Sequence, residues 1–299
     1  MAKVFNILSN AAKKAMPYAL YYSILRLQGR QKAAELAALA PALAMAADNA
    51  QFCEKYKGRR CFVLCNGPSV KQQDIRALRG EIVFSVSSGY LHPDYLHFQP
   101  RFHCVPQVTY TKMGRDGAIA WFNEMHDKLG TAEVFLSHTE APLVQEEKLF
   151  SGRKVHYVIF NGTFDLWSSE RIPDLCEPIP RVQSVPIMCL MIALFMGFSE
   201  IYLIGTDHDH IRTGKYLYFY EPTVLKGMDT SIDAQGNIIA SLHDELQGLA
   251  RLWRDYRCIR AIATKHGVRI FNATLGGMLD EFPRVSLEQA LNRCADTHR

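Results

Sequence analysis

The chain has 299 residues, 48% of them hydrophobic, and a formal net charge of +4. This length is enough for one large α/β domain or two small ones, and so mild a charge does not suggest a dedicated nucleic-acid binder. We expect no membrane-spanning helix because the sequence has no run of 18 apolar residues. Lys13 and Lys14 interrupt the first apolar stretch, so the order typical of a signal peptide is missing. The eight cysteines include no Cys-x-x-Cys pair and mostly lie in apolar runs, which favours buried thiols in the cytoplasm.

Residues 1–57 form a segment of distinct composition. The first 50 are rich in Ala, Leu, Lys and Arg, which predicts helix, with breaks near Pro17 and Pro41. Aromatic and leucine side chains at 16–28, with basic neighbours, suit the surface of a membrane. Packing on the rest of the protein, or on a second copy in a homo-oligomer, is the alternative. We therefore predict a helical N-terminal extension over 1–57, peripheral at the inner membrane face or docked on protein.

From residue 58 onward, short apolar runs alternate with helical patterns. Runs of β-branched and aromatic residues with little charge are typical of strands buried on both faces of a parallel sheet. Such strand–helix alternation predicts an α/β, Rossmann-like, mostly parallel doubly wound sheet in a single domain over 58–299. Residues 206–240 have no clear period, and we interpret them as an active-site lid. The predicted strands are 61–65, 82–86, 102–105, 133–136, 155–160, 201–204 and 268–271, and the predicted helices are 70–78, 116–129, 186–196 and 243–266.

The turn after the first predicted strand has residues that suit a nucleotide. Gly67 lets the backbone approach a ligand closely, and Pro68 is pre-set for the first turn of a helix. Free amides at the helix start, near Ser69, are able to face a phosphate, and Asn66 is able to bond a phosphate, ribose or base. An ordinary strand–helix turn is the alternative, because the motif is neither the dinucleotide-binding glycine fingerprint nor a Walker loop.

A second polar region is expected where helix 186–196 begins and strand 201–204 ends. Arg181 and Ser184, at the entrance to the helix, are suited to a phosphate or an acceptor carboxylate. A plain N-cap role for Ser184 is the alternative. The strand delivers Gly205, Thr206 and Asp207 to the sheet edge at which open α/β sheets bind ligands.

Four titratable side chains follow each other at 207–210. Alternation along an extended segment would put Asp207 and Asp209 on one side and His208 and His210 on the other. The two aspartates would then suit a divalent metal such as Mg²⁺, and the histidines would suit bases near neutral pH. Catalysis or substrate contact without metal, with His208 and Asp209 taking part, and a solvated loop are the alternatives.

Three more candidates come from the C-terminal part. His243 begins the last long helical pattern, closes the irregular segment and is a candidate general base. Asn272 and Thr274 follow the last predicted strand, where they are expected to contact the nucleotide. A helix-start histidine in water and a simple glycine turn are the respective alternatives.

Taken together, these motifs resemble those of a known enzyme family. Cys65-Asn66-Gly67-Pro68-Ser69 is similar to the Gly-Asn-Gly-Pro-Ser loop of bacterial sialyltransferases in glycosyltransferase family 42. Residues 181–189 resemble the Arg-x-x-Ser-Gly stretch of that family, and residues 197–207 resemble its Gly-Tyr-x-Glu-Ile-Tyr-Leu-x-Gly-x-Asp run. The resemblance covers roughly residues 58–285.

The resemblance implies roles for individual residues. It implies that Asn66, Arg181, Ser184 and also Ser87, which falls at the position of a nucleotide-binding Asn, contact a CMP-like nucleotide. It implies that a lid tyrosine supports the leaving phosphate, the candidates being Tyr216 and Tyr218. The sequence departs from the family at Asp209, which stands where the family has a phosphate-binding Tyr.

The chain also resembles a broader group that contains flagellin-modifying motility factors and is named for an archaeal 6-hydroxymethylpterin diphosphokinase. The runs 202–207 and 272–277 are more similar to that group. The leading hypothesis is a glycosyltransferase that moves an acidic sugar (sialic acid, another nonulosonate or Kdo) from a CMP-sugar to a surface glycan or lipid-linked acceptor, in lipopolysaccharide or capsule synthesis. In it, His243, or else His208 or His210, deprotonates the acceptor, and no cofactor is required. The alternatives are a diphosphokinase that uses ATP with Mg²⁺ at Asp207 and Asp209, and a non-catalytic nucleotide- or glycan-binding partner.

Overall fold

The computed structural model describes residues 39–106, 108, 113–164, 171–221, 233, 235 and 237–292. The chain divides into two compact units, Met1–Ala44 and Met45–Arg299. Of the first unit the structure describes residues 39–44, which are helical, so the expected membrane-facing stretch at 16–28 lies outside the described residues. No helix in the described ranges is both long and apolar enough to span a bilayer.

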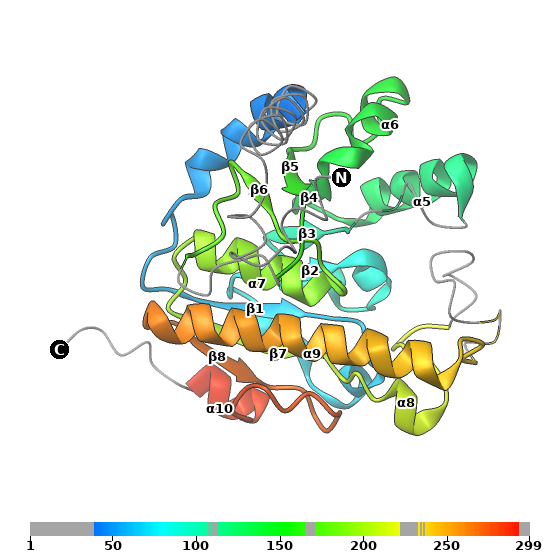
Figure 1. Ribbon diagram of the computed structural model, residues 1–299, viewed down its shortest axis with the longest axis vertical. Coiled ribbons are helices and arrows are strands. Elements are labelled where there is room, and N and C mark those ends of the chain that lie inside the picture. The colour runs from blue at the N-terminus through cyan, green and yellow to red at the C-terminus, as the bar shows by residue number, and fades with distance from the viewer. Residues whose placement is uncertain are drawn as a thin grey trace, which may run out of the picture. The chain divides into compact units, whose positions relative to one another are not determined.

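The second unit contains one parallel sheet, as the sequence predicts. Its order over the described residues is β6-β5-β4-β3-β2-β1-β7-β8, and every neighbouring pair is parallel. The fold is therefore an α/β, Rossmann-like sheet with flanking helices (Figure 1). The strands are β1 Arg60–Leu64, β2 Val83–Val86, β3 Phe102–Cys104, β4 Glu133–Ser137, β5 Val155–Phe160, β6 Pro178–Ile179, β7 Glu200–Ile204 and β8 Arg269–Asn272.

Helices cover both faces of this sheet. The described α-helices are α4 Tyr95–Phe98, α5 Gly114–Lys128, α6 Ala141–Glu146, α7 Val185–Phe195, α8 His210–Thr213, α9 Leu242–Lys265 and α10 Leu287–Asn292. Successive residues of β1 alternate between two cores: Cys61 and Val63 pack in the cluster with α7 and α9, whereas Phe62 and Leu64 pack in the cluster with α4, α5 and α10. Both faces of each central strand are therefore buried, which is why the strands appear in the sequence as almost uninterrupted apolar runs.

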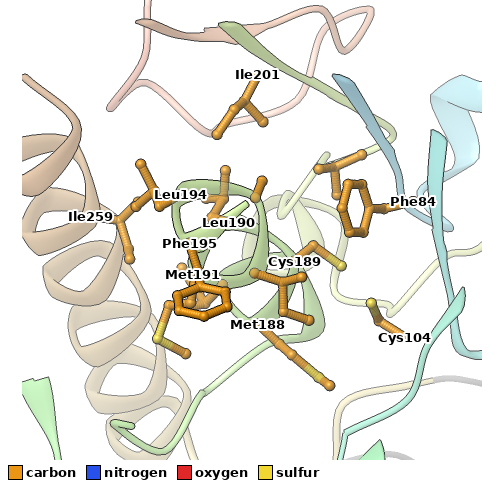
Figure 2. Close-up of a cluster of buried hydrophobic side chains, with 14 of the residues drawn as sticks. Phe84, Cys104, Met188, Cys189, Leu190, Met191, Leu194, Phe195, Ile201 and Ile259 are labelled. Atoms are coloured by element: carbon orange, nitrogen blue, oxygen red, sulfur yellow. The ribbon is translucent and has the colours of Figure 1, made fainter. Parts of the chain in front are cut away.

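Helix α7 is the centre of the first core. Every residue from Pro186 to Phe195 is buried. Figure 2 shows side chains of α7 packed between α9, through Ile259, and the sheet, through Ile201 and Phe84. Because fully burying each large aliphatic side chain contributes about 1.5–3 kcal/mol, α7 is held firmly and its N-terminus has a fixed position.

The start of the second unit differs from the expected boundary at residue 57. The short 3₁₀ helix η1, Ala47–Phe52, packs into the body: Phe52 is fully buried against Phe102 and Phe135. Asn49 is also buried, and its side-chain amide donates to the carbonyls of Tyr157 and Leu175. These residues therefore belong structurally to the body.

The predicted helix over 70–78 is wrong. The segment forms two short 3₁₀ helices, η2 Pro68–Gln72 and η3 Ile75–Leu78. Gln73 between them is extended, and its side chain donates to the Ala273 carbonyl. Asp74 then caps η3 by accepting from the Arg76 amide, so side-chain hydrogen bonds interrupt what would otherwise be one helix.

The remaining 3₁₀ helices are η4 Ser87–Leu91 and η5 His138–Glu140. Cys61, Cys65, Cys104 and Cys189 are buried free thiols, which confirms the expectation for these four positions; Cys53 is exposed.

Candidate functional site

The site lies where the strand order reverses. The chain adds strands on one side of β1 from β2 to β6, and then places β7 on the other side of β1. The turns that leave β1 and β7 meet at this switch point, where the Gly67 amide donates to the Gly205 carbonyl at 2.9 Å. Open α/β sheets bind ligands at the carboxyl ends of their strands at such a point.

A cavity of about 580 Å³ opens at this edge. It is lined by the turns after β1, β2 and β7, by the entrance to α7, by the tyrosine-containing segment 216–220 and by one face of α9. Most of the candidates from the sequence are here. Those that line it are Asn66, Gly67, Ser87, Ser184, Gly205, Thr206, Asp207, His208, Asp209, His210, Tyr216 and Tyr218.

Asp207 joins the turns after β1 and β7. Its Oδ1 accepts from the Ser69 amide at 3.2 Å, and its Oδ2 accepts from the Ser69 hydroxyl at 2.8 Å. Both residues are buried, and burial raises the pKa of the Asp207 carboxyl, with the Ser69 bonds opposing that shift. The amide expected to face a ligand phosphate is thus already bonded to a carboxylate of the protein.

Three glycines make room where the turns after β1 and β7 meet. A Cβ at Gly67 would lie 1.8 Å from Asp207 Oδ2, and one at Gly277 would lie 2.7 Å from the Asp207 backbone. Gly277 also has a φ of +73°, a region in which side chains are strained. A Cβ at Gly205 would meet the Cys65 carbonyl at 2.7 Å. Gly67 and Gly277 therefore make room for Asp207, and Gly205 makes room for the backbone of the turn after β1.

The wall formed by β1 and β2 presents a buried acceptor. The Asn66 side-chain amide donates to the Val86 carbonyl at 3.1 Å and to the Tyr220 hydroxyl at 3.3 Å. Asn66 Oδ1 is buried and has no partner within the described residues. Ser87, which follows Val86, has a φ of +46°. A positive φ strains the backbone of a residue other than glycine, and such strain is concentrated at functional sites. Asn66 and Ser87 both line the cavity, so this wall offers polar groups to a ligand.

The entrance to α7 forms another wall. Ser184 is the N-cap of α7 and has an extended backbone, but its side chain makes no capping hydrogen bond. Its hydroxyl and the positive end of the buried helix are therefore available to an anion. Arg181 is exposed and does not line the cavity, so the structure does not bring its side chain to the residues that do.

The expected alternation over 207–210 is wrong. His208 has a φ of +48°, which turns the chain, and α8 starts at His210. All four residues from Asp207 to His210 then line the same cavity. His208 Nε2 lies 2.7 Å from the Tyr256 hydroxyl, and burial lowers the pKa of His208 to about 4, so its ring is neutral at pH 7. Its contacts suit a residue that positions the turn.

His210 belongs to a polar cluster at the cavity wall. Its Nε2 lies 3.4 Å from Glu245 Oε2, and its ring stacks on Tyr216 with centroids 4.1 Å apart. The Tyr216 hydroxyl donates to the same Glu245 oxygen at 3.2 Å. His210 and Glu245 are both buried. A histidine beside a carboxylate is the arrangement that general-base catalysis uses, because the carboxylate stabilises the protonated ring.

His243, the first choice for a base, is not part of this cluster. It is exposed on the first turn of α9, its Nε2 contacts the Gln247 side chain, and it does not line the cavity. The adjacent residues Asp244 and Glu245 line it instead. The helix therefore directs the neighbours of His243, and not His243 itself, toward the site.

Asn272 and Thr274 have internal partners. The Asn272 side chain donates to the Leu279 carbonyl and accepts from the Thr274 amide. Thr274 Oγ1 accepts from the Thr206 amide at 3.0 Å. Neither Asn272 nor Thr274 lines the cavity, and neither does Pro68 or Ser69. These residues shape the turns and are not placed to contact a nucleotide there.

The aspartates fit a resident metal poorly. Both carboxylate oxygens of Asp207 accept hydrogen bonds from Ser69. Of the two aspartates expected to bind a metal, only Asp209 therefore has a carboxylate that is not bonded to Ser69. Within the described ranges, no group of three or more His, Cys, Asp or Glu side chains is arranged to hold a metal ion.

Sequence reasoning missed Glu245, Tyr220 and Arg251, all of which line the cavity. The sequence does contain a signal for Tyr220, because Tyr216, Tyr218 and Tyr220 alternate. In the structure the rings of Tyr218 and Tyr220 stack with their centroids 5.3 Å apart. Glu245 and Arg251 lie in a polar helical pattern in which nothing marks them out.

No model of a known protein family matches the sequence, and no curated protein matches it. Among solved structures, the chain is similar to the sialyltransferase CstII from Campylobacter jejuni in complex with a substrate analogue, cytidine-5'-monophosphate, with 13% identity, 77% of this chain and 86% of that chain covered, and a TM-score of 0.45. It is also similar to a structure of that sialyltransferase with a trisaccharide acceptor and CMP, at 14% identity, 76% and 86% coverage and a TM-score of 0.42. A variant with CMP has 13% identity, the same coverage and a TM-score of 0.47.

Proposed function

We propose that this chain is a glycosyltransferase that moves an acidic sugar from a CMP-sugar to a glycan or glycolipid acceptor. The observation that carries the proposal is the composition of one cavity at the switch point of the sheet. That cavity combines the hydrogen-bonding side chains of Asn66 and Ser87 at the strand ends, and of Ser184 at the α7 entrance, with the His210–Glu245 pair on the opposite elements.

The nucleotide would lie along the walls formed by β1, β2 and α7. The unpartnered Asn66 Oδ1 would accept from the amino group of a cytosine or from a ribose hydroxyl. The phosphate would lie at the N-terminus of α7, where the Ser184 hydroxyl is not used for capping. The sequence resemblance of the turn at 65–69 and of residues 181–184 supports cytidine as the base.

The acceptor would lie beside His210. Inverting glycosyl transfer needs a base to take the proton from the acceptor hydroxyl as its oxygen attacks the sugar. His210 would take that proton, and Glu245 would stabilise the ring as it becomes positively charged. Tyr218 is the better candidate to stabilise the leaving phosphate, because the Tyr216 hydroxyl already donates to Glu245.

Activity of two histidine variants tests this assignment. Purified enzyme is assayed with CMP-N-acetylneuraminate and CMP-Kdo on a glycan acceptor panel, in EDTA and in Mg²⁺. His210→Asn is expected to lower kcat by about 10²–10⁴-fold, with unchanged circular dichroism, while the matched control His243→Asn stays within twofold of wild type.

The opposite pattern, in which His243→Asn abolishes turnover and His210→Asn does not, would reject the assignment of the base. Turnover that requires ATP and Mg²⁺ and uses no CMP-sugar would reject the proposed function in favour of diphosphoryl transfer. Nucleotide binding with no turnover of any donor would favour a non-catalytic partner.

A further inference from the structure

The charged residues of the cavity are unevenly distributed. Asp207, Asp209, Asp244 and Glu245 line it, and Arg251 is the only lysine or arginine among the described residues that line it. The donor of the proposed reaction, which carries a phosphate and a carboxylate, would therefore lie in a largely acidic setting. An anionic group would be repelled by these four carboxylates and attracted to the N-terminus of α7 and to the one guanidinium, Arg251.

Arg251 belongs to the face of α9 that borders the cavity. The residues of α9 that line the cavity recur every three to four positions, which places them along one side of the helix. These residues are Asp244, Glu245, Gly248, Leu249, Arg251 and Leu252.

The other three arginines of α9 have partners within the protein. Arg254 lies 3.5 Å from Asp255, and Arg257 and Arg260 lie 2.8 Å and 3.2 Å from Glu281. Arg251, which is exposed at the cavity, has no ion pair or hydrogen bond with the part of the chain that the structure describes. A guanidinium without a partner beside a cavity is ready to form a bidentate contact with an oxyanion.

Gly248 leaves space one turn before Arg251. It lies inside α9, where glycine is destabilising relative to alanine. A Cβ built at Gly248 would have no atom within 4 Å apart from the adjacent backbone of α9 itself, so packing does not explain the glycine. Because side chains three apart on a helix are neighbours, this open space is adjacent to the Arg251 side chain.

We propose that Arg251 binds an anionic group of the substrate, a phosphate or a carboxylate, in the space that Gly248 leaves open. The proposal deepens the proposed function and rests on it for the identity of the substrate. The phosphate of the nucleotide and the carboxylate of the acidic sugar share the chemistry that a guanidinium recognises, and binding measurements separate them.

Calorimetric titration of Arg251→Gln provides the test. The probes are cytidine, CMP, CMP-N-acetylneuraminate and the methyl ester of that donor. The matched control is Arg212→Gln, because Arg212 is also exposed, lies on the nearby α8 and does not line the cavity. Arg251→Lys, which keeps the charge but not the fork, is expected to bind with intermediate affinity.

If Arg251 holds the phosphate, Arg251→Gln weakens CMP at least tenfold and leaves cytidine within twofold. If it holds the carboxylate, the variant binds CMP like wild type and weakens the acidic donor at least tenfold, while the methyl ester is unaffected. The loss becomes smaller as salt is raised, as expected for an exposed charge. Unchanged affinities for all four probes, or an equal loss in Arg212→Gln, would overturn the proposal.

Failure of the proposed function has a different signature. If wild type binds another nucleoside monophosphate and not CMP, the cytidine assignment fails, and Arg251 is tested with that nucleotide and its nucleoside. A wild-type chain that binds neither CMP, nor the CMP-sugar, nor another nucleoside monophosphate overturns both proposals.

Discussion

Replacing Asp207 with alanine should reveal how strongly the turns after β1 and β7 are joined. The substitution removes Oδ1, which accepts from the Ser69 amide at 3.2 Å, and Oδ2, which accepts from the Ser69 hydroxyl at 2.8 Å. Each orphaned buried donor costs about 1–3 kcal/mol, and relief of the buried charge offsets part of that cost. We therefore expect the free energy of unfolding to fall by about 2–4 kcal/mol, with a drop in Tm of about 5–15 °C.

Asp207→Asn is the matched variant. Its carboxamide keeps an oxygen for the Ser69 amide and offers an NH₂ to the Ser69 hydroxyl, so the expected loss is below about 1 kcal/mol. Urea unfolding of both variants and of Ser69→Ala at pH 7 gives the free energies, and a double-mutant cycle isolates the coupling between the two residues. A change of less than about 0.5 kcal/mol in Asp207→Ala would refute the account of this contact.

Other substitutions test separate features of the same unit. Gly276→Ala should lower the free energy of unfolding by about 1–2 kcal/mol because of its positive φ. Gly277→Ala should lower it by at least about 2 kcal/mol more, because its Cβ would also meet the Asp207 backbone at 2.7 Å; equal losses in urea unfolding would contradict this. Gly248→Ala should raise the free energy of unfolding by about 0.5–1 kcal/mol and raise the KM for the donor severalfold, and a stabilised variant with unchanged KM would show that the space is not used. Burial lowers the pKa of His208 to about 4, so the unfolded chain binds its proton first as pH falls below about 6.5. The free energy of unfolding should therefore decrease as pH falls from about 6.5 to about 4, and His208 contributes at most about 3 kcal/mol of that loss. In urea titrations at several pH values, His208→Asn should lack this contribution to the pH dependence; asparagine is chosen because it tolerates the left-handed backbone of this position.

The sequence was sufficient to predict most of the fold because the relevant signals are local. Strands such as β1 and β7 are buried on both faces and appear as short apolar runs. Helix α7 was expected at 186–196 and forms at Val185–Phe195, with Pro186 at its start. β6 was missed because it has two residues and begins with Pro178, which leaves no periodic pattern to detect.

The polar turns were located correctly, but their partners were not visible in the sequence. Ser69 and Asp207 are 138 positions apart, and only the sheet order brings them together. The Ser69 amide is able to donate either to a ligand phosphate or to a carboxylate of the protein. The residues of the turn alone therefore do not show which of these acceptors it meets. His243 and Glu245 are two positions apart on α9, and the rotation of the helix decides which of them borders the cavity.

The most direct test of the central claim is the thermal stability of the purified chain with CMP in EDTA, compared with ATP and Mg²⁺. A ligand that binds only the folded state, at about 100 times its Kd, adds about 2.7 kcal/mol to the free energy of unfolding. We expect CMP to raise Tm by about 5–10 °C without any metal. A rise with ATP only in the presence of Mg²⁺, with none for CMP, would contradict the account.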